Sequence, residues 1–171
     1  MESTLLNLRS ESKNHGKLEM ENINLQTIIA EVINIQKVAL ETKKINLEFN
    51  HSTDLNIKGN EAALKQVFTN LISNAIKFSH QEGKIWIKAK KKEKEIHIDV
   101  TDEGLGFQME NSEALFKPFT EYSRLGTQGE SSQGMGLFIT RRFVYKHSGQ
   151  LIAKSEGLNR GATFSIRLPH D

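Results

Sequence analysis

Apolar residues recur at the spacing of one helix face in three stretches of the chain. After Asn24, a residue type that often caps helices, the first stretch predicts a helix over about 25–43. The second predicts a longer helix over about 60–78, and the third predicts a helix over 136–148 that Gly149 would end. The apolar positions of the long helix are Leu64, Val67, Phe68, Leu71, Ile72, Ala75 and Ile76.

Apolar and polar residues alternate in six shorter segments, as they do in half-buried strands. These segments lie at residues 45–50, 55–58, 84–90, 95–100, 151–155 and 163–168. The third and fourth are joined by a lysine-rich stretch, which predicts a β-hairpin with a solvated tip rather than a surface for nucleic acid. Helices and antiparallel pairs in this order predict an α/β fold, a two-layer α/β sandwich.

Two polar segments interrupt this pattern. Residues 1–23 are mostly polar, and the three leucines among the first eight residues match the tail of a helix. Residues 103–133 are rich in Gly, Ser, Thr, Gln and Glu around one apolar island, LFKPF at 115–119. A connection of this length within a compact domain is uncommon and is usually functional or mobile.

Composition narrows the class of protein without identifying a function. The chain has 171 residues, 37% of them hydrophobic and 26% charged, which suits one globular domain. The net charge of +2 is too small to indicate nucleic acid binding, and the absence of cysteine excludes disulfides and thiolate metal sites. No apolar run approaches the roughly 20 residues of a membrane helix, and the N-terminus lacks the apolar core of a signal peptide. We expect a cytoplasmic domain, an expectation that leaves a membrane-anchored parent protein open.

Four clusters of residues carry candidate chemistry. In the first, spacings of four and three place Asn70, Asn74 and Lys77 on one face of the long helix, and Phe78 follows them. Amide oxygens are hard ligands of the kind that Mg²⁺ prefers, and an ammonium binds phosphate oxygens. Taken alone, the cluster is more simply explained as a solvated polar helix face.

The second cluster, DEGLG at 102–106, follows a strand whose inward residues are two isoleucines and a valine. Asp102 continues that alternation, so its carboxylate is expected to point inward, where it needs a hydrogen-bond donor. The exocyclic amine of adenine is one such donor, and Gly104 and Gly106 would let the backbone approach a base closely. An ordinary Asp/Gly turn at the end of a strand explains the same string.

The third cluster, Gly134, Gly136 and Leu137, lies at the start of the last predicted helix. Backbone N–H groups at a helix N-terminus bind anions, and glycines allow a phosphate to come near. The fourth is Thr163 in the segment GATF, where its hydroxyl would serve the base side of a nucleotide pocket. A flexible loop and a β-former that starts a strand are the alternative explanations. Neither a P-loop nor a dinucleotide-binding glycine fingerprint occurs.

Taken in order, these clusters resemble the motifs of the GHKL superfamily, the gyrase, heat-shock chaperone, histidine kinase and mismatch-repair ATPases. NLISNAIKFS resembles the N box, DEGLGF the first glycine box, LFKPF the F box, GMGLFI the second glycine box, and GATFSIRLP the last glycine box with the closing strand. The resemblance covers roughly residues 24–169. It implies a Bergerat-type sandwich, in which helices cover one face of a mixed sheet and ATP lies between the helices and the sheet.

The resemblance also implies a role for each polar site residue. Asp102 would receive the adenine amine, and Phe78 would pack near the base or the ribose. Asn74 would be the Mg²⁺ ligand with Asn70 nearby, and Lys77 would contact the phosphates.

The remaining motif residues would shape and cover the pocket. The pocket would be formed by Gly104, Gly106, Gly134 and Gly136, with Leu137 behind them and Thr163 on the base side. Residues 107–133 would form an ATP lid that Phe116 and Phe119 anchor by packing. Arg124 within this lid is a candidate for contact with the γ-phosphate.

One position separates the subfamilies. The ATP-hydrolysing members carry a glutamate, which activates water as a general base, where this chain has Asn70. An asparagine has no basic lone pair at neutral pH, so the resemblance favours a kinase with Asn70 and Lys77 as catalytic residues. The segment GKLEMENINLQTIIAEV resembles the linker between a kinase dimerisation helix and its catalytic domain. Residues 1–23 would then be the end of that helix and its linker, and 24–171 the catalytic domain.

We therefore expect the Mg²⁺-ATP-binding domain of a two-component sensor histidine kinase, which phosphorylates a histidine on a separate, upstream dimerisation domain. None of the six histidines lies in the expected H-E/D-x-x-x-P context; His15 fits a solvated linker and His147 a capping or packing role. The expected partners are the dimerisation domain and the receiver domain of a response regulator, with a homodimeric parent and a monomeric fragment. A gyrase- or chaperone-type ATPase, a nucleotide-binding adaptor and a serine kinase of the anti-sigma type remain as alternatives.

Overall fold

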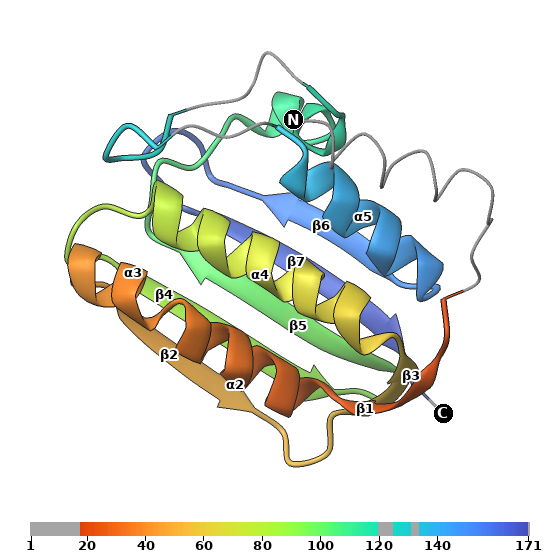
Figure 1. Ribbon diagram of the computed structural model, residues 1–171. Coiled ribbons are helices and arrows are strands. Elements are labelled where there is room, and N and C mark those ends of the chain that lie inside the picture. The colour runs from red at the N-terminus through yellow and green to blue at the C-terminus, as the bar shows by residue number, and fades with distance from the viewer. Residues whose placement is uncertain (1–17, 120–124, 131–133, 171) are drawn as a thin grey trace, which may run out of the picture.

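The computed structural model describes residues 18–119, 125–130 and 134–170. Figure 1 shows a layer of helices lying across one face of a five-stranded sheet. The sheet has the order β2-β4-β5-β7-β6, in which β2 and β4 run parallel and the other neighbours run antiparallel. The predicted two-layer α/β sandwich with a mixed sheet is therefore confirmed.

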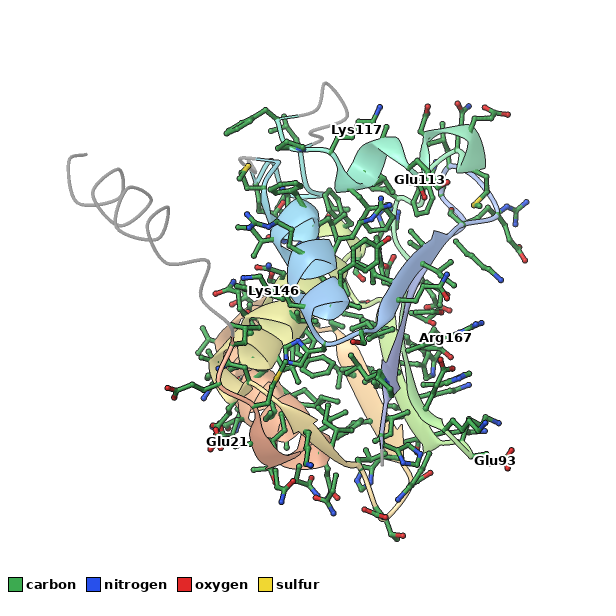
Figure 2. All side chains as sticks on the ribbon, turned by 90° about the vertical axis from the view of Figure 1, so that its right-hand side faces the viewer. Glu21, Glu93, Glu113, Lys117, Lys146 and Arg167 are labelled. Atoms are coloured by element: carbon green, nitrogen blue, oxygen red, sulfur yellow. The ribbon has the colours of Figure 1, made fainter. Side chains whose placement is uncertain are left out.

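The strands of this sheet alternate between a buried face and an open face. They are β2 (Asn46–His51), β4 (Lys84–Lys91), β5 (Glu95–Asp102), β6 (Gln150–Lys154) and β7 (Ala162–Pro169). Side chains on the inward face, such as Ile87, Ile98 and Ile166, are completely buried against the helices. Figure 2 shows the opposite face, where Arg167 points away from the helical layer.

Four helices supply the other layer. They are α2 (Leu25–Ile35), α3 (Lys37–Lys43), α4 (Glu61–Phe78) and α5 (Gly136–Lys146). The side chain of Asn24 accepts a hydrogen bond from the N–H of Thr27, and that of Asn60 accepts one from Ala63, so both asparagines cap helices. No helix within the described residues combines the length and apolarity needed to cross a membrane.

The prediction of one helix over 25–43 is wrong, because the chain breaks at Gln36 into α2 and α3. Neither proline nor glycine marks the break, and apolar residues continue on both sides of it. The N–H of Gln36 still bonds to the carbonyls of Val32 and Ile33, but its backbone, with φ of −85° and ψ of 3°, leaves the helical conformation and ends the first helix. Periodicity alone does not reveal such a break.

A second, two-stranded sheet was not fully predicted. β1 (Glu21–Asn24) pairs antiparallel with β3 (Asn56–Gly59), and Ile23 is the one buried residue of β1. β1 was not predicted because its sequence is mostly polar and shows no clear alternation. It is the pairing partner of the strand that was expected at residues 55–58. Residues 1–17, where the end of a dimerisation helix was predicted, lie outside the described residues.

The end of α5 also differs from the prediction. Ser148, with φ of 56°, adopts the left-handed conformation that ends the helix, and Gly149 does not. Gly149 is needed for space, because a Cβ there would lie 2.5 Å from the backbone oxygen of Arg167. His147 is buried, as a packing role requires: its Nδ1 donates to the carbonyl of Phe143, and its Nε2 accepts from the N–H of Asn60.

Candidate functional site

A pocket lies between the C-terminal half of α4, the end of β5, the first turn of α5 and the start of β7. The space between these elements measures about 530 Å³, including the part that is open to solvent. It is lined by Asn74, Phe78, Asp102, Leu105, Gly106, Phe107, Leu115, Leu137, Ala162 and Phe164. The sequence clusters at 74–78, 102–106 and 137 are thus brought together around one mostly apolar space.

Asp102 is the charged residue in this lining, and the alternation of β5 buries it as predicted, with 5% exposure. Its Oδ1 accepts a hydrogen bond of 2.8 Å from the N–H of Gly104. Burial raises the pKa of Asp102 from 3.8 to about 6, and hydrogen bonds from the backbone of Gly104 and Ala162 limit that rise. A buried carboxylate facing an apolar pocket provides an acceptor for a ligand that carries an N–H donor.

The two glycines after Asp102 let the loop pack closely on protein backbone: Gly104 lies against the end of α4, and Gly106 lies against the connection between β6 and β7. A Cβ on Gly104 would lie 2.1 Å from the carbonyl oxygen of Phe78, and the next residue, Leu105, donates its N–H to that oxygen. Gly106 has φ of 57°, and a Cβ there would lie 2.2 Å from the carbonyl oxygen of Gly157. Only glycine fits either position, because the loop approaches protein backbone closely. Gly106 also lines the pocket, and the close approach of a base to these glycines stays a prediction.

The polar residues of α4 divide into two groups. Asn74 lines the pocket, and its side-chain amide has no hydrogen bond to any residue in the described part of the chain. Asn70 lies one turn behind, where its Nδ2 donates to Gly136 O at 3.0 Å and to Thr140 Oγ1 at 3.2 Å. Asn70 therefore ties α4 to the first turn of α5.

Lys77 projects from the last turn of α4 and carries a buried ammonium. Within the described residues its Nζ has no hydrogen-bond partner and lies 4.9 Å from the ring centroid of Phe78. Burial lowers the pKa of Lys77; the charge of Glu130 acts in the opposite direction, and that of Lys43 adds to the decrease. A buried cation without a partner is costly and fits an anion that arrives from outside.

The end of α4 is completed by a residue that the sequence did not single out. Lys43, at the end of α3, donates from its buried Nζ to the carbonyl oxygens of Ile76 and Lys77 and to Thr127 Oγ1. It also forms an ion pair of 2.7 Å with Glu130. Lysines are common at helix C-termini, so the sequence gives no sign that Lys43 is buried. Its role becomes visible only from the packing of α3 against α4.

The start of α5 contributes one residue to the pocket lining. Leu137 lines the pocket, whereas Gly134 and Gly136 do not. Gly134 has φ of 68°, which favours glycine, while a Cβ on Gly136 would meet no atom closer than 3.7 Å. The structure therefore requires glycine at 134 for conformation, and leaves Gly136 room for a side chain.

Between β5 and α5 lie two short 3-10 helices, η1 (Met109–Asn111) and η2 (Ala114–Phe116). Phe116 is buried, as predicted, and the guanidinium of Arg141 lies 5.2 Å from its ring centroid. The prediction that Phe119 also anchors this segment by packing is wrong: Phe119 has φ of 52° and is 78% exposed. The chain turns at Pro118, so the two phenylalanines do not share a side. Arg124 lies outside the described residues.

The prediction for Thr163 is also wrong. Successive residues of β7 face opposite sides of the sheet, so Ala162 and Phe164 line the pocket and Thr163 faces away from it. Its hydroxyl lies 3.0 Å from that of Thr101, its neighbour across the strand pair. The apolar lining residues Leu105, Phe107, Leu115, Ala162 and Phe164 were not predicted. Leu105 and Phe107 follow Asp102 closely in the chain, Ala162 and Phe164 lie beside it across the strand pair, and Leu115 comes from η2.

The family model for histidine kinase-, DNA gyrase B- and HSP90-like ATPases matches residues 59–171. The sensor-like histidine kinase SenX3 of Mycobacterium tuberculosis is 29% identical over 150 residues, which are 88% of this chain and 36% of SenX3. The SenX3 protein of Mycolicibacterium smegmatis is 26% identical over 151 residues, 88% of this chain and 39% of that protein. The chain thus spans little more than a third of the curated relatives that it matches.

Solved structures are similar over most of the chain. The nucleotide-free catalytic domain of histidine kinase ThkA has a TM-score of 0.78 and 27% identity, covering 89% of this chain and 98% of that one. The mycobacterial sensor histidine kinase MprB has a TM-score of 0.76 at 21% identity, covering 88% of this chain and 97% of that one, and supports the fold alone.

Proposed function

The chain belongs to the family of histidine kinase-, DNA gyrase B- and HSP90-like ATPases, and from this premise we propose that it binds Mg²⁺-ATP and transfers the γ-phosphoryl to a histidine on a separate domain. It is an ATP-binding catalytic domain of the sensor histidine kinase type, similar to the catalytic domain of ThkA. Since ATP is an intracellular substrate, the domain would work on the cytoplasmic side of any membrane.

One observation carries the proposal: a mostly apolar pocket is lined by the buried carboxylate of Asp102 and by Phe78, and the buried ammonium of Lys77, unpartnered among the described residues, lies 4.9 Å from the centroid of the Phe78 ring. In the proposal, Asp102 accepts the adenine amine at the base end, which consists of Asp102, Leu105 and Phe164. Phe78 packs near the base or the ribose. The ammonium of Lys77 contacts phosphate oxygens at the phosphate end, which consists of Asn74 and Lys77.

Mg²⁺ fits the residues at the phosphate end. The amide of Asn74 lines the pocket without a partner in the described part of the chain, and its carbonyl oxygen is a suitable hard ligand. No group of three or more His, Cys, Asp and Glu side chains that could hold a metal occurs among the described residues, so most of the other oxygen ligands would come from phosphates and water. When bound, Mg²⁺ would neutralise charge on the phosphates. Asn74 would orient this ligand set, and Lys77 would share the phosphate charge.

The surroundings of Asn70 favour transfer to a protein over transfer to water. Its amide nitrogen donates to Gly136 and Thr140, and its Oδ1 accepts from Gln66 Nε2. An amide held in this way supplies no general base for water activation. In the proposed reaction the bond between the γ-phosphorus and the bridging oxygen of ATP breaks as a P–N bond to the imidazole forms, and ADP leaves. The protein contributes mainly positioning and charge neutralisation.

The acceptor and the downstream partner are proposed to lie outside this chain. The relatives are much longer, and a structure of histidine kinase ThkA has been solved in complex with the response regulator protein TrrA, with 25% identity to this chain. We extend this arrangement to a homodimeric parent, with a dimerisation domain ahead of residue 24 and a receiver domain as the partner of the phosphohistidine. Residues 107–133 would act as the ATP lid.

The test is phosphotransfer with γ-labelled ATP, using the chain alone and mixed with a dimerisation domain from the parent kinase. We expect acid-labile label on the dimerisation domain and none on the chain alone. The control is the same domain with its acceptor histidine changed to glutamine. Label on the isolated chain, or release of phosphate to water without transfer, would contradict the proposal.

A further inference from the structure

Lys43 is a buried cation beside the phosphate end, and it does not line the pocket. Its side chain is 4% exposed, and its Nζ lies within hydrogen-bond distance of Ile76 O, Lys77 O and Thr127 Oγ1, at 3.0, 2.9 and 2.8 Å. Two of these acceptors are carbonyls in the last turn of α4, where the helix dipole favours a cation. These bonds explain why a lysine is tolerated there.

The fourth partner of Lys43, Glu130, is not explained by that capping role. Its carboxylate binds Lys43 Nζ at 2.7 Å and accepts the N–H of Gln128 at 2.8 Å. The pKa of Glu130 is lowered: burial alone would raise it, but the hydrogen bonds from Lys43 and the backbone together outweigh that effect. The carboxylate is therefore ionised and directed at Lys43 in this structure.

Glu130 also lies next to Lys77. A Cβ placed on Gly126 would lie 2.3 Å from Glu130 Oε2 and 2.6 Å from Lys77 Cγ, so both side chains border the same small space. Thr127 holds the short segment 125–130 there, because its N–H donates to Lys77 O and its hydroxyl donates to Ser79 O. Within the segment, Gly126 N donates to Glu130 O. One carboxylate thus lies near two ammonium groups and pairs with that of Lys43.

We propose that Lys43 is a positioning residue for the phosphate end: by pairing with Glu130, it keeps that carboxylate off Lys77 and leaves the Lys77 ammonium available for phosphate. The inference rests on the proposed function, in which Lys77 contacts phosphates. Without Lys43, Glu130 would turn to the buried ammonium of Lys77, since an unpaired buried charge is costly. It would then compete with the nucleotide for the same cation.

This account predicts opposite effects for the two members of the ion pair. Lys43→Met should weaken ADP binding on the order of tenfold, because Glu130 becomes the competitor of the phosphates. Glu130→Gln should tighten ADP binding by about threefold, because a negative charge is removed from the neighbourhood of the phosphates. The double variant should return close to the wild-type affinity. A purely structural role predicts that both single variants weaken binding.

The measurement is calorimetric titration of the whole chain with ADP and, separately, with adenosine. Adenosine lacks phosphates, so its affinity should change by less than about twofold in every variant, whereas a general distortion of the pocket would weaken both ligands. Combining Lys43→Met with Lys77→Met should give no further loss of ADP affinity beyond Lys77→Met alone. The matched control is the exposed neighbouring pair Lys44 and Glu82, whose Nζ and Oε1 are 3.5 Å apart; Lys44→Met and Glu82→Gln should leave ADP binding unchanged.

The outcomes separate this inference from the function on which it rests. Loss of ADP affinity in Lys43→Met that the double variant restores supports the inference. If Lys43→Met fails to fold, tighter ADP binding by Glu130→Gln with unchanged adenosine binding supports the charge competition on which the inference rests. Unchanged or weaker ADP binding by Glu130→Gln overturns the inference alone, provided that the wild type binds ADP. Equal losses of ADP and adenosine affinity in a folded Lys43→Met variant also overturn it. Failure of the folded wild type to bind ADP overturns the proposed function together with the inference.

Discussion

At the base end of the pocket a buried carboxylate receives a backbone hydrogen bond, whereas at the phosphate end a buried ammonium has no hydrogen-bond partner among the described residues. Burial raises the pKa of Asp102 and lowers that of Lys77, so in both places it disfavours the charged form. The base end is held by glycines that fit against backbone, and the phosphate end by the side-chain contacts of Lys43 and Glu130. If ATP binds as proposed, the base would be recognised by a rigid backbone-supported carboxylate, whereas the charge offered to the phosphates would depend on the ion pair of Lys43 and Glu130.

The largest expected effect is the loss of nucleotide binding on removing the carboxylate. Asp102→Asn should weaken both ADP and adenosine roughly a hundredfold, because a charged acceptor is lost and an amide donor is placed opposite the adenine amine. Calorimetry with both ligands measures this. If Asp102→Asn weakened ADP binding and left adenosine binding unchanged, Asp102 would contact the phosphates and not the base, which would contradict the proposal.

The same substitution should stabilise the empty protein at pH 7. Asp102 has a folded-state pKa of about 6 against 3.8 when unfolded, so the folded state binds the proton more tightly and loses roughly 2 kcal/mol of stability as the pH rises from 4 to 7. Urea unfolding of the Asp102→Asn variant and of the wild type at several pH values measures the difference. The advantage of the variant should be greatest at pH 7 and shrink as the pH falls toward 4. If the Asp102→Asn variant were less stable than the wild type at pH 7, burial of the charged Asp102 carboxylate would not destabilise the folded state as proposed.

At the phosphate end, Lys77→Met should reduce ADP affinity about tenfold and leave adenosine affinity within about twofold. The matched control is Lys65→Met on the same helix, where the lysine binds Glu31 at the surface instead of lying beside the pocket. Equal losses for ADP and adenosine would show that Lys77 supports the base end as well.

The smallest effect should come from pH at the base end. Because a protonated Asp102 loses its charge, adenosine binding should be up to about tenfold weaker at pH 5 than at pH 7, following a pKa of about 6. The Asp102→Asn variant should lack this dependence at concentrations where its binding can still be measured. A wild-type affinity that is constant from pH 7 to 5 would mean that the charge on Asp102 does not contribute.

Site residues could be predicted where the periodicity of a strand or helix decides which way a side chain faces. Strand alternation correctly placed Asp102 inward, and helical spacing placed Asn74 on the pocket side of α4. The same alternation, applied to β7, would have selected Ala162 instead of Thr163. The motif specifies the residue type at position 163, whereas the side of the strand that a residue faces follows from its position in the alternation.

Other features could not be predicted from the sequence pattern, because they depend on contacts between residues that are far apart in the chain. Lys43 and Thr127 are 84 positions apart, and nothing in a polar loop indicates which of its residues reaches a buried lysine. Phe119 resembles Phe116 in type, yet the backbone turn between them leaves it exposed. The overall sandwich was predictable because six alternating segments and three amphipathic helices repeat one simple rule, burial of the apolar face.

The central claim is that this pocket binds ATP, with the base at Asp102 and the phosphates at Lys77. Calorimetric titration of the wild-type chain with ATP, with and without Mg²⁺, tests it most directly. The account predicts saturable binding at one site per chain that Mg²⁺ strengthens. A folded chain that shows no binding at about 1 mM ATP, in the presence of Mg²⁺, would contradict it.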